Sequence, residues 1–173
     1  MKNKLLLALS LLTSIYFTGC GSQKGEEESL TPPSGMRYLN ISRTGMNLNV
    51  LTPDSLAGIL DTVMQSWGAY EIKVGKDFQI SVEEGEGDVA MVKSDNSNND
   101  VNKLKKYIVD DPTTLVWESG VADLSEFHFY HIAKVGGRSY IVQDIKGEPF
   151  SQKAIEKMID CAKNLKEIKK AKS

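Results

Sequence analysis

The fold is decided by residues 127–145, which read FHFYHIAKVGGRSYIVQDI. Residues 127–133 and residues 139–145 both have the composition and patterning of strands with one buried face. Between them stands Val135-Gly136-Gly137-Arg138, a short glycine-containing connection of the kind that joins antiparallel strands. This stretch therefore predicts a β-hairpin.

The same pattern occurs earlier in the chain and predicts a second hairpin. Residues 70–74 (YEIKV) and 78–82 (FQISV) alternate between apolar and polar side chains, and Gly75-Lys76-Asp77 forms the turn between them. Three further short runs predict single strands, at residues 47–50, 89–92 and 113–117. The polar stretch 94–100 predicts an exposed loop.

Three segments have helical spacing. Pro149-Phe150-Ser151 opens the clearest one, whose apolar stripe is Ala154, Ile155, Met158, Ile159, Ala162, Leu165 and Ile168, with lysines crowded at its end. Thr52-Pro53-Asp54 resembles a helix start, and the spacing after it predicts a helix over 53–66 with Leu56, Ile59, Leu60, Val63, Met64 and Trp67 on one side. Asp100 is expected to cap a short helix that carries Val101, Leu104, Tyr107 and Ile108.

These elements predict an α+β fold for residues 36–173, a single domain in which an antiparallel β-sheet built from hairpins packs against a long C-terminal helix. The order of elements resembles that of PsbP-like and secretion-chaperone-like α+β domains, where a terminal helix packs on an antiparallel sheet. The resemblance implies an arrangement of elements and carries no function with it.

Composition sets the broad class of protein. The 173 residues are 40% hydrophobic and 25% charged, and the formal net charge is −2. If Lys2 and Lys4 leave with a cleaved segment, 19 basic side chains face 23 acidic ones. A mildly acidic chain has no basic surface to neutralise phosphates, so we expect no nucleic acid among its partners.

The N-terminus has the layout of a signal peptide. A short basic start is followed by 13 apolar residues, Leu5 to Phe17, too few to span a bilayer. The run ends in Phe17-Thr18-Gly19-Cys20, which resembles the lipobox of bacterial lipoprotein precursors, although Phe17 replaces the usual aliphatic residue. The resemblance implies that residues 1–19 are removed and that Cys20 is acylated. An ordinary secretory signal is the alternative.

Residues 20–35 are expected to form a flexible tether between the lipid and the domain, because they contain almost no large apolar side chains. Ser22, rather than Asp, follows the anchor by two positions, which in lipoprotein sorting terms implies the outer membrane. Glu26-Glu27-Glu28 resembles the export signal of surface lipoproteins, or is a solvated spacer. The periplasmic and the surface-facing side both stay open.

Few residues suggest chemistry. His128 and His131 are the only histidines, and an odd spacing places them on opposite faces of a strand, so we expect no shared metal site. Cys161 lies on or beside the apolar stripe of the last helix and is expected to be buried, rather than nucleophilic. No catalytic residue, cofactor or metal site is predicted.

Two acidic loops, residues 83–88 and 95–100, carry the remaining candidate ligands. Residues 95–100 (DNSNND) begin like a calcium loop, but Asp100 and Lys106 stand where an EF-hand needs Gly and Glu. Both loops are expected to be solvated.

The sequence therefore predicts a non-enzymatic, lipid-anchored envelope protein that touches the membrane through Cys20. It would act as a binding or accessory module for a protein or glycan partner, which an exposed aromatic sheet face would suit. The alternative is an envelope hydrolase, or a carrier of a small ligand or cation, that uses the loops 83–88 and 95–100.

Overall fold

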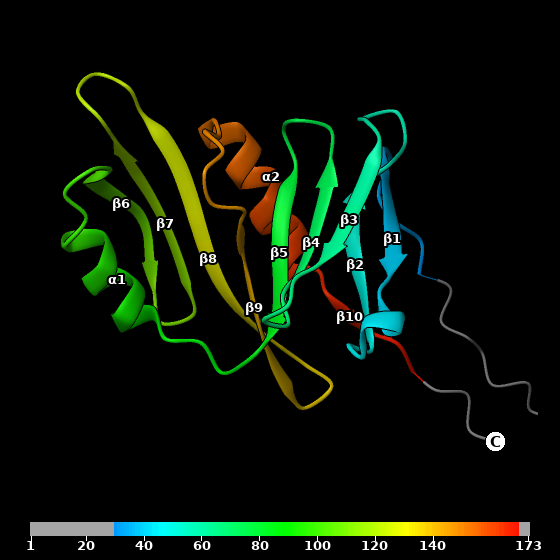
Figure 1. Cartoon of the computed structure of the whole chain (residues 1–173). Helices are drawn as coiled ribbons and strands as arrows, with labels where there is room; N and C mark the ends of the chain where they lie inside the picture. Colours follow the sequence, from blue (N-terminus) through cyan, green and yellow to red (C-terminus); the bar gives the residue numbers. More distant parts are fainter. Residues whose placement is uncertain (1–29, 170–173) are drawn as a thin grey trace, which may run out of the picture.

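The computed structural model describes residues 30–169 and contains two antiparallel sheets and two α-helices (Figure 1). The larger sheet has seven strands in the order β3-β4-β5-β9-β8-β7-β6. Their bounds are β3 Leu60–Met64, β4 Tyr70–Val74, β5 Gln79–Glu84, β6 Lys103–Asp111, β7 Thr114–Gly120, β8 Glu126–Val135 and β9 Arg138–Asp144. The smaller sheet, in the order β1-β2-β10, comprises β1 Met36–Asn40, β2 Leu48–Pro53 and β10 Lys166–Glu167. A short 3₁₀ turn, Ser42–Thr44, connects β1 and β2.

Both predicted hairpins are confirmed, and they are neighbours at the centre of the larger sheet. Strands β8 and β9 pair up to Val135 and Arg138, and Gly136 and Gly137 turn between them with φ of +59° and +76°. Those angles suit the primed turn that matches strand twist. Strand β5 of the other hairpin then pairs with β9, with Val82 opposite Val142.

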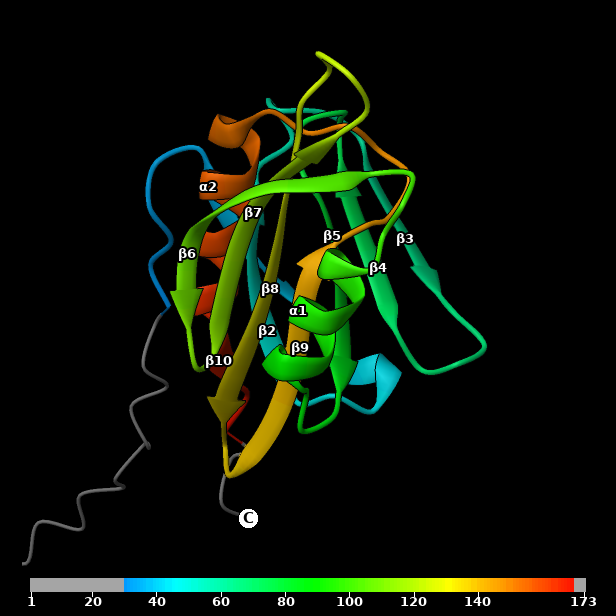
Figure 2. The ribbon, with the colours of Figure 1, turned by 90° about the vertical axis from the view of Figure 1, so that its left-hand side faces the viewer.

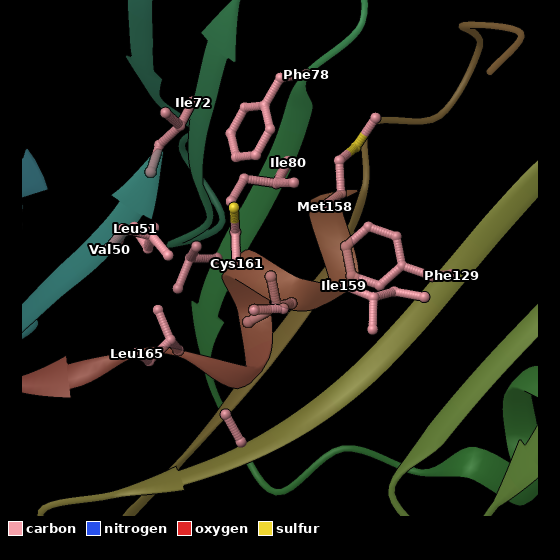
Figure 3. Packing of buried hydrophobic residues seen from close by; sticks show 14 of the residues in the cluster. Val50, Leu51, Ile72, Phe78, Ile80, Phe129, Met158, Ile159, Cys161 and Leu165 are labelled. Atoms are coloured by element: carbon pink, nitrogen blue, oxygen red, sulfur yellow. The ribbon is translucent and has the colours of Figure 1, made fainter. Parts of the chain in front are cut away.

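Helix α2 (Gln152–Lys163) covers one face of the larger sheet and also contacts β2 of the smaller one (Figure 3). The Ser151 hydroxyl accepts a hydrogen bond from the Ala154 N–H, which starts the helix as predicted. The buried residues of α2 are Ala154, Ile155, Met158, Ile159, Cys161 and Ala162. They join one buried apolar cluster that also includes both sheets.

The α+β class is therefore correct, but the last helix is shorter than expected. It ends at Lys163, where the Asn164 side chain donates to the Asp160 carbonyl. Leu165 is still buried, whereas Lys166 and Glu167 leave the helix and pair with β2 as β10. A sheet partner thus replaces the last turn of the expected helix.

The predicted helix over 53–66 is wrong. This segment is the end of β2, a loop and the edge strand β3. Gly58 has φ of +152°, which no helix contains, and a side chain there would come within 2.7 Å of the Gly75 backbone. The loop therefore packs backbone to backbone against the turn after β4. Helical spacing in this segment was coincidental, and Leu56 and Ile59 are exposed.

Two further predictions are wrong in the type of element: a helix replaces an expected strand, and a strand replaces an expected helix. The expected strand 89–92 is the start of helix α1 (Val89–Ser97), because the Asp88 carboxylate accepts from the Met91 N–H as an N-cap. This helix also occupies part of the loop expected over 94–100. The expected helix after Asp100 is strand β6 instead. Asn99, not Asp100, organises the connection: its side-chain oxygen accepts from the N–H groups of Val101 and Asn102.

Helices α1 and α2 lie on opposite sides of strands β7 and β8 (Figure 2). On β8, Phe129 belongs to the buried cluster on the α2 side, and the Tyr130 hydroxyl accepts from the Asp88 N–H at the start of α1. Among residues 30–169, no helix has the length and apolar character required to cross a membrane.

Candidate functional site

A polar pocket of about 330 Å³ opens on the α1 side of the larger sheet. Its floor comes from β6, β7 and β8, and its walls come from the C-terminal end of α1, the loop that follows and the connection after β9. The lining residues are Asp95, Asn96, Asn99, Asn102, Leu104, Trp117, Ser119, Glu126, His128, Lys146 and Gly147. We call this site the polar pocket.

His128 is the best-supported side chain of the polar pocket. Its Nδ1 lies 2.8 Å from Oδ2 of Asp144, a residue at the end of β9 that is 4% exposed. The other Asp144 oxygen accepts from the Phe129 N–H at 2.7 Å. On the opposite edge of the ring, Nε2 is 3.5 Å from Glu126 Oε1. Asp144 thereby fixes the imidazole orientation and leaves Nε2 directed toward Glu126.

These carboxylates change the protonation of His128. Burial lowers its pKa, but the hydrogen bond and charge of Asp144, together with the charge of Glu126, outweigh burial and leave the pKa above its ordinary value of 6.5. The imidazolium is therefore stabilised between two acids. Asp144 and Glu126 therefore orient the His128 ring and favour its charged, doubly protonated form inside the pocket.

Trp117 supplies the aromatic surface of the polar pocket. It lies directly across from His128 in the β7–β8 register, with ring centroids 5.3 Å apart and planes inclined by 31°. Ser119 and Glu126 form the next cross-strand pair on the same face of the sheet. Strand alternation alone therefore gathers these four side chains on one face of the sheet.

Three residues that line this pocket each carry a buried polar atom without a hydrogen-bond partner: Asn96 Nδ2, Ser119 Oγ and Glu126 Oε1. The Glu126 oxygen has only the long ion-pair contact with His128. Buried groups of this kind cost about 1–3 kcal/mol each when they stay unsatisfied. Three of them around one pocket mark it as a candidate binding site.

The prediction that the two histidines face opposite sides is confirmed. His131 points to the α2 side, where its Nδ1 is 2.8 Å from the Thr114 hydroxyl. Burial lowers the pKa of His131, and the nearby Lys163 charge lowers it further. The two rings therefore lie in separate environments on opposite faces of β8.

The two acidic loops do not combine either. Helix α1 lies between them, so the loop 83–88 precedes the helix and residues 95–100 end it. Glu84 binds Arg138 at 3.0 Å and Glu86 accepts from Ser139, whereas Asp95 lines the polar pocket. Within residues 30–169, no group of three or more His, Cys, Asp or Glu side chains is placed to hold a metal ion.

The burial predicted for Cys161 is confirmed. Its side chain is within the apolar cluster under α2, and burial raises its pKa to about 12 (Figure 3). Such a thiol is protonated at neutral pH and is a poor nucleophile. Cys20, the predicted lipidation site, lies outside the described residues, so its acylation stays a prediction.

A second candidate surface lies at one edge of the same sheet. Strand β3 pairs only with β4, and Figure 2 shows it at the outer margin. Exposed apolar side chains follow this strand and its two flanking loops: Leu56, Ile59, Val63, Met64 and Trp67. Leu56 is 92% and Ile59 is 87% exposed. We call this set the β3 surface.

The opposite edge, β6, is protected. It carries Lys103, Lys105 and Lys106, and its pairing with β7 shifts register twice, as at β-bulges. Helix α1 also contacts β6, where Lys93 reaches Asp110 at 2.6 Å. Lysines, bulges and a covering helix are the usual devices that prevent an edge strand from pairing with another chain.

Sequence reasoning missed both surfaces. Glu126 and His128 are two apart and so share a strand face, but Trp117 and Asp144 reach them only through cross-strand register. The apolar residues of the β3 surface were noticed, but their spacing placed them on one side of an expected helix over 53–66. Comparisons with protein families, with curated proteins and with solved structures find no match to this chain.

Proposed function

We propose that this protein is a non-enzymatic, lipid-anchored module of the bacterial envelope that binds a protein partner through the β3 surface. The anchor is the acylated Cys20 implied by the lipobox-like sequence, and the favoured location is the outer membrane. The partner contributes an extended segment that adds to the free edge of β3.

The observation that carries this proposal is the contrast between the two sheet edges. A free strand edge offers a row of unpaired N–H and C=O groups, which an extended polypeptide satisfies in register by adding a further strand. The apolar side chains that flank this edge supply buried area to such a segment. Large apolar residues with this exposure are characteristic of interaction sites when they gather along one element.

The contact is tested in intact cells with the full-length lipidated protein carrying a photo-cross-linking residue at Val63. We expect one discrete protein adduct at position 63 and none at the matched control position Lys103 on the β6 edge. Ile59→Lys together with Trp67→Lys should abolish the adduct, because both lysines charge the apolar flanks. Equal adducts at both edges, or an adduct that survives the lysines, would contradict the proposal.

Anchoring is tested separately by fractionating the envelope. Cys20→Ser should move the protein from the membrane pellet to the soluble fraction, or leave it unprocessed, because the acyl chains provide the membrane affinity. Processed protein that stays in the pellet would refute the lipid anchor.

One observation favours a second candidate function, an envelope hydrolase or small-ligand carrier. His128, Asp144 and Glu126 converge at the polar pocket, as a general acid–base site requires. Of the two acidic loops in the original alternative, only residues 95–100 reach this pocket. Turnover that disappears in His128→Gln would support the hydrolase over the binding module.

A further inference from the structure

The polar pocket is independent of the β3 surface and lies toward the opposite end of the seven-stranded sheet. Its volume of about 330 Å³ falls at the lower end of the range for small-molecule sites, about 300–1,000 Å³. The space therefore suits a compact ligand rather than a folded partner.

The unsatisfied atoms indicate which hydrogen-bonding groups a ligand of this pocket must carry. Asn96 Nδ2 is a donor, Glu126 Oε1 is an acceptor, and the Ser119 hydroxyl is both. A ligand with several hydroxyl groups matches this mixed set, because each hydroxyl both donates and accepts.

The aromatic wall adds a second requirement. The face of the Trp117 indole carries the negative side of the ring quadrupole and attracts the slightly positive C–H groups of a saturated ring. A ligand that has hydroxyls around its rim and C–H groups on its face satisfies both Trp117 and the polar atoms. Sugars in their ring form have this distribution of groups.

The charges lining the pocket favour a neutral ligand. Asp95 and Glu126 are acidic, and Lys146 and His128 are basic, so neither sign dominates. His128 is also held between Glu126 and Asp144, which offset the charge that an anionic ligand would seek. A phosphate or a carboxylate would therefore meet acids as well as bases.

We propose that the polar pocket is a binding site for a neutral saccharide ring that stacks on Trp117 and hydrogen-bonds to Asn96, Ser119 and Glu126. The inference goes beyond the proposed function and does not depend on it, because the two sites share no residue.

The test is an NMR titration of the ¹⁵N-labelled full-length protein with glucose, N-acetylglucosamine and methyl α-glucoside, and with glucose 6-phosphate as the charged comparator. We expect saturable shifts at the Trp117 indole and at residues 126–128 with at least one neutral sugar. Binding of the methyl glycoside identifies a sugar linked within a chain as a ligand, and binding of the reducing sugars alone identifies a free sugar.

The two tryptophans form a matched pair of variants. Trp117→Ala should weaken binding at least about tenfold, equivalent to about 1.4 kcal/mol, whereas Trp67→Ala on the β3 surface should leave the affinity within about twofold. Asn96→Ala, at the end of α1, should also weaken binding, and it serves if Trp117→Ala fails to fold. The proposal is overturned if no neutral sugar saturates, if the folded pocket variants bind like the parent, or if glucose 6-phosphate binds more tightly than glucose.

Discussion

The β3 and β6 strands end the same seven-stranded sheet, yet the chemistry around them is opposite. Around β6 and its neighbours, polar side chains are paired: Asp144 holds the largely buried His128, and Lys93 pairs with Asp110 on the surface. Around β3, by contrast, large apolar side chains are exposed to solvent. Helix α2 packs on the centre of this sheet and stabilises it there. The two edge regions can therefore differ in chemistry, one with an exposed apolar surface and the other with a polar pocket.

The largest expected effect tests the buried support of the polar pocket, which Asp144 provides from the end of β9. Asp144→Ala removes the acceptor of both the His128 Nδ1–H and the Phe129 N–H, and each unsatisfied group should cost about 1–3 kcal/mol of unfolding free energy. Asp61→Ala, on exposed β3, is the matched control and should stay within about 0.5 kcal/mol. Urea unfolding measures both values. Equal costs for the two variants would show that the support of the polar pocket and the exposed β3 edge do not differ in this way.

A smaller effect comes from titrating the two histidines of β8. Because the folded-state pKa of His128 is raised, its contribution to stability is complete below about pH 6.5 and is lost as pH rises through that pKa. His131 has the opposite sign: its pKa is lowered, so its contribution is complete above about pH 6.5 and is lost as pH falls.

NMR titration of the two imidazole Cε1–H signals measures these pKa values. We expect them on opposite sides of 6.5, and in Asp144→Asn the His128 value should fall while the His131 value stays. A His128 pKa below that of His131 in the parent protein would contradict the interactions of His128 with Asp144 and Glu126.

The smallest expected effect tests the exposed apolar end. Ile59→Ala should change the unfolding free energy by no more than about 0.5 kcal/mol, because this side chain is 87% exposed. Ile159→Ala on α2 is the matched comparison and should cost about 2–5 kcal/mol, since that side chain is buried. Thermal unfolding gives both. A large loss for Ile59→Ala would mean that the β3 surface is part of the core.

Local pattern was sufficient for the elements whose neighbours are close in sequence. The hairpin around Gly136-Gly137 and the cap at Ser151 depend on side chains within a few positions, and both were predicted correctly. The prediction for residues 53–66 was wrong because their apolar spacing fits a helix. The close approach of Gly58 to Gly75 decides the structure there, and alternation and capping rules do not reveal such a contact.

The polar pocket was only partly predictable. The turn at Gly136-Gly137 fixes the β8–β9 register, which places Asp144 beside Phe129 and near His128. The position of Trp117 opposite His128 could not be predicted in this way, because the loop that joins β7 to β8 is longer and does not set the register by itself. Asn96 was assigned to a solvated loop, and only the cap at Asp88 shows that helix α1 carries it to the pocket.

The pairing of β10 with β2 has a consequence for the order in which the chain folds. The hairpins β4–β5 and β8–β9 close short loops and form on a time scale of about 1–10 μs. The small sheet, in contrast, joins Leu48 and Asn49 to Lys166 and Glu167, so nearly the whole described chain must be present before it can close. Such non-local closure slows folding because its entropy cost precedes its contacts. Until β10 has been synthesised, the edge of β2 at Leu48 and Asn49 therefore lacks its strand partner.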